Sequence, residues 1–281
     1  MEQIEIFING IPFINLVNSA TLGNGILKVS DDEKKAFINR FEEKIHGLNI
    51  LKFVPASGAA TRMFKHLYKF VDEFNPTKES FNSYVNREKA SDMSTFFVGL
   101  DKLPFYKEVE ERLLEKFPDY PNLADDIQKY HFVREMMLEE GFNYGNAPKG
   151  LLPFHRYKTH PATAFEEHLY ESALYSASNG VANLHFTVSE SHSDKFNAEF
   201  EKIEKLVETK TGVAFTISFS FQKESTDTIA VDLDDKPFRE ADGSLHFRPS
   251  GHGALIENLN EQDADIIFIK NIDNVVVYRY K

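Results

Sequence analysis

The chain has 281 residues, and its 42% hydrophobic and 27% charged content suffices for one large domain or two ordinary ones. Its net charge of -12 disfavours a nucleic acid or an anionic membrane as partner, because most of the surface would repel either one. The lack of cysteine excludes disulfides and thiolate metal sites. The sequence shows neither a signal-peptide pattern nor an apolar run long enough to span a membrane, so we expect a cytoplasmic protein. It does not indicate an oligomeric state.

Residues 1–48 are predicted to form a helical lead-in. Within them, residues 1–29 predict no regular structure because their apolar side chains are interrupted by Gly and Asn. Ser30 and Glu33 then have the spacing of a capping box, which starts a helix. This helix carries its apolar residues on one face and is expected to stop at Gly47. The apolar residues are Phe37, Ile38, Phe41 and Ile45.

The next stretch predicts a strand, a tight loop and a helix start. Residues 50–56 form a short apolar run with Lys52 as its only charge, which is typical of a buried strand. Four small residues, 57–60, follow, and helical spacing begins at Thr61. Such a loop can direct backbone amides and the positive end of a helix at a phosphate group. The alternative is an ordinary strand-to-helix turn, since a single glycine is a weak signal.

Residues 66–147 are predicted to form a helical insertion. Apolar side chains recur at helical spacing in two segments, and prolines at 118 and 121 end the first of them. These stripes are most simply core, not a cofactor site. The residues in the two stripes are Phe105, Val109, Leu113, Leu114 and Phe117, then Tyr130, Val133, Met137 and Leu138.

Predicted strands and helices alternate after residue 148. The continuous apolar run 266–269 is typical of a central parallel strand, and residues 275–281 look like a further strand. The fold class is therefore α/β, with a mainly parallel, Rossmann-like sheet built from residues 49–65 and 148–281. The other predicted elements are a helix over 161–176, a strand over 182–188, a helix over 196–208, a strand over 213–221, a hairpin around 242–243 and a helix over 254–259.

Two short motifs resemble the signature of the nucleotide-diphospho-sugar transferase superfamily, the sugar-nucleotide pyrophosphorylases and their relatives. Residues 55–62 (PASGAATR) are similar to its strand and glycine-rich loop ending in Thr-Arg. Residues 148–153 (PKGLLP) are similar to its Pro-Lys-x-Leu-Leu-Pro segment. The helical segment between them would then be an insertion within the signature.

Two later motifs extend the resemblance. Residues 248–255 (RPSGHGAL) look like the nucleotide-side loop of the eukaryotic-type branch, and residues 265–274 (DIIFIKNIDN) look like the strand whose terminal Asp holds a divalent metal. The chain also resembles an uncharacterised bacterial family placed in this superfamily, domain-of-unknown-function family 4301.

The resemblance implies a sheet of the nucleotidyltransferase type and an activity. The activity is Mg²⁺-dependent transfer of a nucleotidyl group from a nucleoside triphosphate to a sugar 1-phosphate. Arg62 and Lys149 would be the catalytic residues that hold and neutralise the phosphates, and Asp273 would bind Mg²⁺. The residues implied to contact the nucleotide are Ser57, Gly58, Thr61, Gln222, Gly251 and Gly253.

The chain also departs from the family pattern. Ala59 and Ala60 occupy loop positions where the family commonly has glycine, and the sequence stops soon after Asp273. The resemblance therefore implies a chain truncated after the first metal aspartate, incomplete or inactive as an enzyme. Two other functions stay open: a glycosyltransferase of related fold, and a non-enzymatic interaction module whose working surface is the helical insertion.

Each site residue has a structural alternative. Arg62 could pair with a surface acid, Lys149 could cap a helix, and Asp273 could be a turn residue. The histidines have no spacing that favours zinc and are predicted to be structural. These histidines are His155, His160, His185, His192 and His252.

Overall fold

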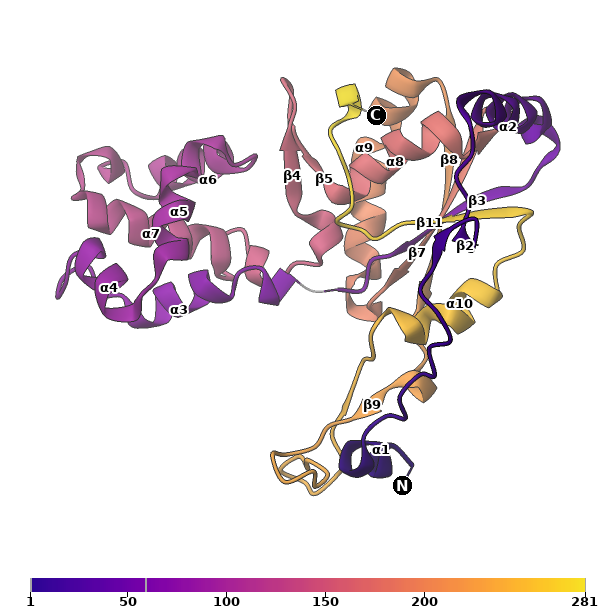
Figure 1. Cartoon of the computed structure of the whole chain (residues 1–281). Helices are drawn as coiled ribbons and strands as arrows, with labels where there is room; N and C mark the ends of the chain where they lie inside the picture. Colours follow the sequence, from indigo (N-terminus) through magenta and orange to yellow (C-terminus); the bar gives the residue numbers. More distant parts are fainter. Residues whose placement is uncertain (1, 59, 281) are drawn as a thin grey trace.

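The chain forms a helical lobe and a lobe built around a sheet. The computed structural model describes residues 2–58 and 60–280, apart from the side chain of Arg62. Residues 65–137 make the helical lobe, and the sheet with its helices lies beside it (Figure 1). The N-terminal segment and a long hairpin extend away from the sheet together. Within the described residues, no helix is long and apolar enough to cross a membrane.

Within the described residues, the main sheet has five strands, and four of them run parallel. Their spatial order is β11, β3, β7, β8, while the short β6 pairs antiparallel with the start of β7. The predicted α/β class is thus confirmed, and the sheet is mixed because β6 runs antiparallel to β7. The strands are β3 (Ile50–Pro55), β6 (Ala177–Ser178), β7 (Val181–Val188), β8 (Ala214–Phe221) and β11 (Ile266–Ile269).

The prediction that residues 266–269 form a central strand is wrong. Strand β11 pairs only with β3 among the described strands, so it lies at an edge, and Ile269 is 58% exposed. Its apolar character has another cause: Phe268 packs edge-on against Phe41 and Tyr175, at ring-centroid distances of 6.3 and 4.8 Å. Aromatic side chains outside the sheet therefore pack on Phe268 of this edge strand.

Two helices pack against the sheet and each other, α8 (Ala164–Tyr175) and α9 (Ser193–Thr211). Both were predicted, and α9 ends where Gly212 adopts a left-handed conformation with φ of 71°. Their apolar side chains and those of the strands form one buried cluster. Its fully buried members include Val54, Phe165, Leu169, Ala182, Leu184, Phe186 and Phe196.

The helical lobe has a hydrophobic core of its own. The predicted stripes are confirmed at Val109, Leu113, Val133 and Met137, which are fully buried. They are wrong at Leu114 and Phe117, which are 39% and 41% exposed and lie outside this core. The first helix begins later than expected: residues 60–62 form a 3-10 turn before it. The elements are η2 (Ala60–Arg62), α3 (Lys65–Glu73), α4 (Phe81–Glu88), α5 (Ser91–Val98), α6 (Tyr106–Lys116) and α7 (Asp125–Met137).

The capping box of the N-terminal segment is confirmed. The Ser30 hydroxyl accepts a hydrogen bond from the Glu33 amide, and the Glu33 carboxylate accepts from the Ser30 amide. The helix that it starts buries none of its residues, and Phe37 is 59% exposed. The elements of this segment are α1 (Glu2–Asn9), β1 (Thr21–Leu22), β2 (Gly25–Ile26), α2 (Asp31–Lys44) and η1 (Ile45–Gly47).

Two hairpins lie outside the main sheet. The predicted one is confirmed: β9 (Thr228–Ile229) and β10 (Phe247–Arg248) pair antiparallel, and Gly243 in its turn has a φ of 84°. The other, β4 (Pro153–Arg156) with β5 (Pro161–Thr163), was not predicted and directly precedes α8. Helix α10 (Ile256–Asn260) follows the 3-10 turn η9 (His252–Leu255).

The prediction of a strand over residues 275–281 is wrong for the described residues up to 280. They contain a 3-10 turn, η10 (Tyr278–Tyr280). The Tyr278 amide donates to the Tyr157 hydroxyl at 2.8 Å, and its ring packs 5.0 Å from that of Tyr170. The segment is therefore held against α8. The remaining 3-10 turns are η3 (Leu100–Lys102), η4 (Tyr120–Asn122), η5 (Tyr144–Asn146), η6 (Lys149–Leu151), η7 (Glu190–His192) and η8 (Glu224–Thr226).

Candidate functional site

Lys149 and Asp273 meet near the carboxyl ends of the parallel strands. Lys149 begins η6, and Asp273 follows β11, 124 positions later in the chain. Lys149 Nζ lies 2.9 Å from Asp273 Oδ2, and the two side chains are 27% and 45% exposed. The structure thus brings together two of the residues for which the resemblance implied a phosphate-binding and a metal-binding role, and both remain open to solvent.

A close contact between their chain neighbours explains why these two residues meet. Gly150 is buried, and a Cβ atom there would lie 3.1 Å from Ile272 Cδ1 and 2.8 Å from Phe196 Cε1. Ile272 is itself only 5% exposed. The absence of a side chain at 150 lets the segment of Lys149 approach the segment of Asp273.

The small-residue loop after β3 lies beside Lys149. The Lys149 amide donates to the Gly58 carbonyl at 3.1 Å, and the Ala60 amide donates to the Ala147 carbonyl at 3.4 Å. The Ser189 hydroxyl, just past β7, donates to the Ser57 carbonyl at 3.3 Å. Hydrogen bonds to backbone atoms of the loop therefore fix it between the ends of two strands and η6, although Ala59 lies outside the described residues.

The fold itself does not require glycine at three of the predicted positions. A Cβ atom on Gly58, Gly251 or Gly253 would meet nothing within 4 Å, and none of the three has a positive φ. The backbone is therefore open to a ligand at these points.

For two other predicted site residues, Thr61 and Gln222, there is no hydrogen bond to Lys149 or Asp273 among the described residues. Thr61 is exposed, and the Arg62 side chain lies outside the described part of the structure. Gln222 directly follows β8, and its side-chain amide donates to Asp227 Oδ1 at 3.2 Å. A base edge would have to replace this internal contact in order to bind Gln222.

Asn258 is a structural residue of the site that sequence reasoning missed. It is 1% exposed, and its side-chain amide donates to Ser220 Oγ at 2.9 Å and to the Phe221 carbonyl at 2.8 Å. These bonds attach α10, and with it the segment of Gly251 and Gly253, to the end of β8. A polar residue inside the apolar pattern of a short helix was the available signal.

The ion pair favours the ionised form of Asp273. The hydrogen bond from Lys149 is the main cause that lowers the pKa of Asp273, so the carboxylate is ionised at neutral pH. Among residues 2–58 and 60–280, no group of three His, Cys, Asp or Glu side chains could hold a metal ion. A cation at Asp273 would therefore need further ligands from a bound molecule or from water.

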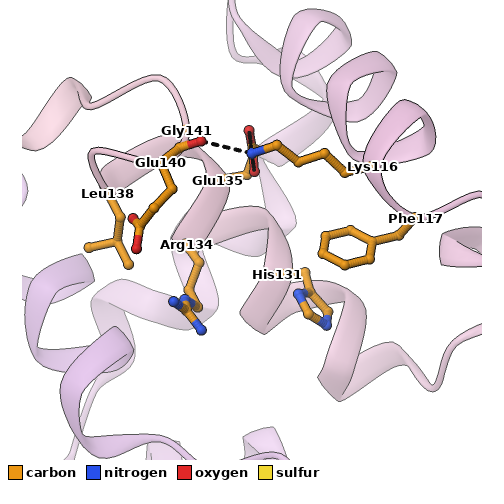
Figure 2. Close-up of a pocket in the computed structure, with 8 residues that line it drawn as sticks. All are labelled: Lys116, Phe117, His131, Arg134, Glu135, Leu138, Glu140 and Gly141. Atoms are coloured by element: carbon orange, nitrogen blue, oxygen red, sulfur yellow. Dashed lines mark hydrogen bonds and ion pairs between the residues drawn. The ribbon is translucent and has the colours of Figure 1, made fainter.

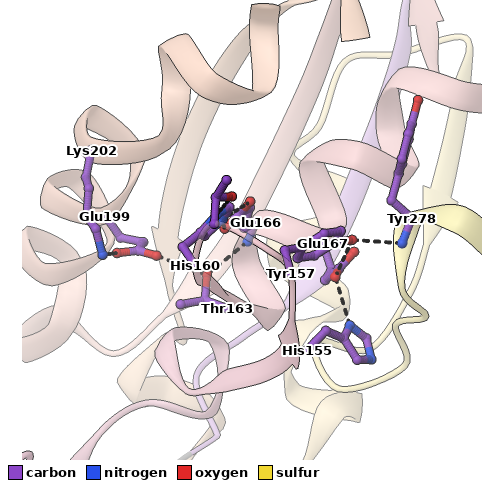
Figure 3. A network of polar contacts seen from close by, with 10 residues as sticks. His155, Tyr157, His160, Thr163, Glu166, Glu167, Glu199, Lys202 and Tyr278 are labelled. Atoms are coloured by element: carbon purple, nitrogen blue, oxygen red, sulfur yellow. Dashed lines mark hydrogen bonds and ion pairs between the residues drawn. The ribbon is translucent and has the colours of Figure 1, made fainter. Parts of the chain in front are cut away.

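Helix α8 carries an unpredicted buried polar face, which we define as Glu166, Glu167, His168 and Glu171. All four are at most 5% exposed. His160 Nε2 lies 2.8 Å from Glu166, and the hairpin that follows η6 contributes two contacts to Glu167 (Figure 3). They are His155 Nδ1 at 2.8 Å and the Tyr157 hydroxyl at 2.9 Å.

Glu171 connects this face to the sheet. Its carboxylate lies 3.5 Å from Nζ of Lys52, which is fully buried in β3, and 2.7 Å from Nζ of Lys270 at the end of β11. Burial raises the pKa of Glu171, but Lys52, Lys270 and the Tyr175 hydroxyl together lower it to about 2. Lys52, the only charged residue of the predicted strand, is therefore paired with the carboxylate of Glu171 in α8.

A pocket in the helical lobe is the less suitable candidate site. It measures about 180 Å³ and is lined by charged residues of α6 and α7 (Figure 2). Glu135 is paired with Arg112 at 2.9 Å and with Lys116 at 2.7 Å, and Lys116 also donates to the Glu140 carbonyl. These charges already satisfy each other, which indicates a structural role.

A second pocket, of about 360 Å³, lies between the helical lobe and β4. Apart from His66, its described lining is apolar, from Met63 and Phe64 on one side to Leu152 and Phe154 on the other. Burial lowers the pKa of His66, so the ring is neutral at pH 7. A phosphate group is not expected here because the lining offers no cation.

The comparisons place the chain in a family without assigning an activity. No curated protein and no solved structure matches the chain. One family model, described as a domain of unknown function, DUF4301, matches residues 1–281. The chain therefore belongs to the DUF4301 family.

Proposed function

We propose that the chain is a nucleotidyltransferase with a Rossmann-like sheet of that type. It would bind a nucleoside triphosphate and transfer the nucleotidyl group to a sugar 1-phosphate in the presence of Mg²⁺. The contact of Lys149 with Asp273, beside the loop of Gly58, carries the proposal. These three residues come from distant motifs and gather near the carboxyl ends of parallel strands, where α/β sheets bind ligands.

The chemistry of the reaction fits this arrangement. Nucleotidyl transfer joins anionic reactants, so catalysis depends mainly on positioning and on charge compensation. Lys149 would neutralise phosphate charge, with Arg62 as a second cation. Open backbone at Gly58, Gly251 and Gly253 would let the phosphates approach closely. In the free chain, Lys149 and Asp273 neutralise each other.

Asp273 fits a role as a Mg²⁺ ligand. In nucleotide sites, Mg²⁺ is usually bound by one or two carboxylates together with waters and substrate phosphates. Asp273 is a single, ionised and 45% exposed carboxylate, which matches this pattern. When bound, the ion would supply charge compensation on the phosphate oxygens.

Calorimetric titration with each of the four ribonucleoside triphosphates, with and without MgCl₂, tests the proposal. Lys149→Met and Asp273→Asn should each weaken Mg²⁺-dependent binding at least about tenfold, since a charge-assisted hydrogen bond contributes about 1.5–3 kcal/mol. Lys129 and Asp125 form a matched ion pair on α7, and Lys129→Met and Asp125→Asn should leave binding unchanged. If the unmodified chain binds none of the four triphosphates, the proposal is refuted.

Two further assays separate the rival functions. Exchange of labelled pyrophosphate into the triphosphate supports nucleotidyl transfer, whereas binding of a sugar nucleotide without exchange supports a glycosyltransferase. A protein partner whose capture is indifferent to Lys149→Met and Asp273→Asn supports an interaction module.

A further inference from the structure

The segment that leads to Asp273 is attached to α8 at two places. His168 Nε2 lies 3.1 Å from the Ile272 carbonyl, and Lys270 Nζ donates to both carboxylate oxygens of Glu171 at 2.7 Å. His168 is fully buried, and Glu171 is 5% exposed. Residues 270–272 are therefore anchored to a buried helix, directly before the carboxylate that contacts Lys149.

The protonation state of His168 follows from this contact. A carbonyl can only accept, so Nε2 carries the proton and donates it to Ile272. Burial, followed by the charge of Lys52, holds the pKa of His168 well below its usual range, so the ring is neutral. Its Nδ1 atom is buried with no hydrogen-bond partner among the described residues.

This unsatisfied nitrogen argues against a space-filling role. A buried acceptor without a donor destabilises the folded state, and an apolar side chain of similar size would avoid that penalty. Among the described residues, the hydrogen bond to Ile272 is the side-chain contact of His168 that an apolar side chain could not make. Ile272 also packs on Gly150, so His168 holds from one side the residue against which the Lys149 segment rests.

We infer that His168 is a positioning residue for Asp273, assisted by the bond between Lys270 and Glu171. Through the Ile272 carbonyl, it holds the Asp273 carboxylate within ion-pair distance of Lys149. The step from this geometry to nucleotide binding rests on the proposed function. The geometry itself can be tested without any nucleotide.

Cross-linking by a water-soluble carbodiimide provides that test, because the reagent joins a lysine to a carboxylate in direct contact. Mass spectrometry of the digested chain gives the yield of the Lys149–Asp273 link relative to the Lys129–Asp125 link of α7. His168→Leu should lower this relative yield at least about fivefold. His168→Gln should keep at least half of it, since a glutamine amide can donate to the same carbonyl.

Two more variants control for stability and folding. Ser172→Ala removes a buried hydroxyl of α8 whose side-chain hydrogen bond goes to Ser176, the residue that follows the helix, and should leave the yield unchanged. Lys270→Met acts from the partly exposed end of the segment and should lower the yield even where His168→Leu does not fold. An unchanged yield in the folded variants His168→Leu and Lys270→Met would overturn the inference.

Nucleotide titration completes the experiment. If the proposed function holds, Mg²⁺ raises the affinity of the unmodified chain for a triphosphate. His168→Leu should reduce this increase at least about tenfold, whereas His168→Gln should retain it. An unmodified chain that forms the Lys149–Asp273 link but binds no triphosphate would refute the proposed function and leave the positioning role standing. The opposite result is a His168→Leu chain that no longer forms the Lys149–Asp273 link but still shows the full Mg²⁺-dependent increase in triphosphate affinity. It would refute the claim that positioning of Asp273 matters for nucleotide binding.

Discussion

Replacing Glu171 by Gln should destabilise the chain far more than an ordinary surface substitution. Lys52 is fully buried in β3, and its Nζ lies 3.5 Å from the Glu171 carboxylate and 3.1 Å from the His168 carbonyl. The substitution removes the negative charge and leaves the lysine cation in the core. A buried cation that loses the charge of a neighbouring carboxylate is destabilised, because water does not solvate it.

Two arguments give the magnitude. Removing one partner of a buried ion pair typically costs about 3–5 kcal/mol. Independently, the pKa of Glu171 is lowered from 4.5 to about 2, which corresponds to about 3 kcal/mol of stabilisation by its ionised form. Because the pKa is depressed in the folded chain, this stabilisation is complete above pH 4.5 and is lost as the pH falls towards 2. Lys270 shares in this stabilisation through its hydrogen bonds to both Glu171 oxygens, but its side chain is 26% exposed and reaches water when Glu171 is replaced.

Urea unfolding at pH 7 measures the effect. Glu171→Gln should lower the free energy of unfolding by about 3–5 kcal/mol, and its stability should vary less than that of the unmodified chain between pH 4.5 and 2. The double variant Lys52→Met/Glu171→Leu should recover most of the loss, because an apolar pair of similar volume often replaces a buried ion pair at little cost. A loss below about 1 kcal/mol in the single variant, or a double variant less stable than the single one, would refute the reasoning.

Four further substitutions test other parts of the structure by thermal or urea unfolding. Gly150→Ala should cost about 1–3 kcal/mol because its methyl group would overlap Phe196, whereas Gly58→Ala, with open space, should stay within about 0.5 kcal/mol. Asn258→Ala should cost about 1–3 kcal/mol, since it removes the hydrogen bonds that the Asn258 amide donates to the Ser220 hydroxyl and to the Phe221 carbonyl. The unmodified chain should lose stability as the pH falls below 6.5, by up to about 1.4 kcal/mol per unit for each histidine whose pKa is depressed, because the unfolded chain takes up protons that the folded chain excludes. His168→Leu should reduce this slope between pH 7 and 5; an unchanged slope would contradict the buried, neutral ring.

Local signals predicted most elements of the fold. The capping box at Ser30, the strand over residues 50–56 and the stripes of α6 and α7 were all recognised, since each depends on spacing within one segment. The neighbours of a strand depend on contacts between distant segments. For that reason β11 was expected at the centre of the sheet but lies at its edge, and the tail over residues 275–280 was expected to be a strand but binds α8 as a turn.

Short motifs in the sequence located the candidate site. They did not predict the buried polar residues of α8 that hold the site segments in place. Gly58, Lys149 and Asp273 were singled out from loops that resemble a known signature, and the fold brings them together. The buried polar face of α8 produced no such motif. Its acids follow Phe165 in a segment with an apolar stripe at helical spacing, which predicts an amphipathic helix with exposed carboxylates.

A lone charge in the strand before the site was the available signal for that face. A lysine in a buried strand requires a carboxylate within reach, and the helix offers Glu167 and Glu171 one turn apart. Spacing alone cannot choose between them. In the structure Glu167 accepts from the hairpin that follows Lys149, while Glu171 binds Lys52 and Lys270 of the two strands beside Asp273. Helix α8 therefore contacts both the segment that follows Lys149 and the segment that precedes Asp273. Its buried polar residues help to position these two segments, in addition to stabilising the core.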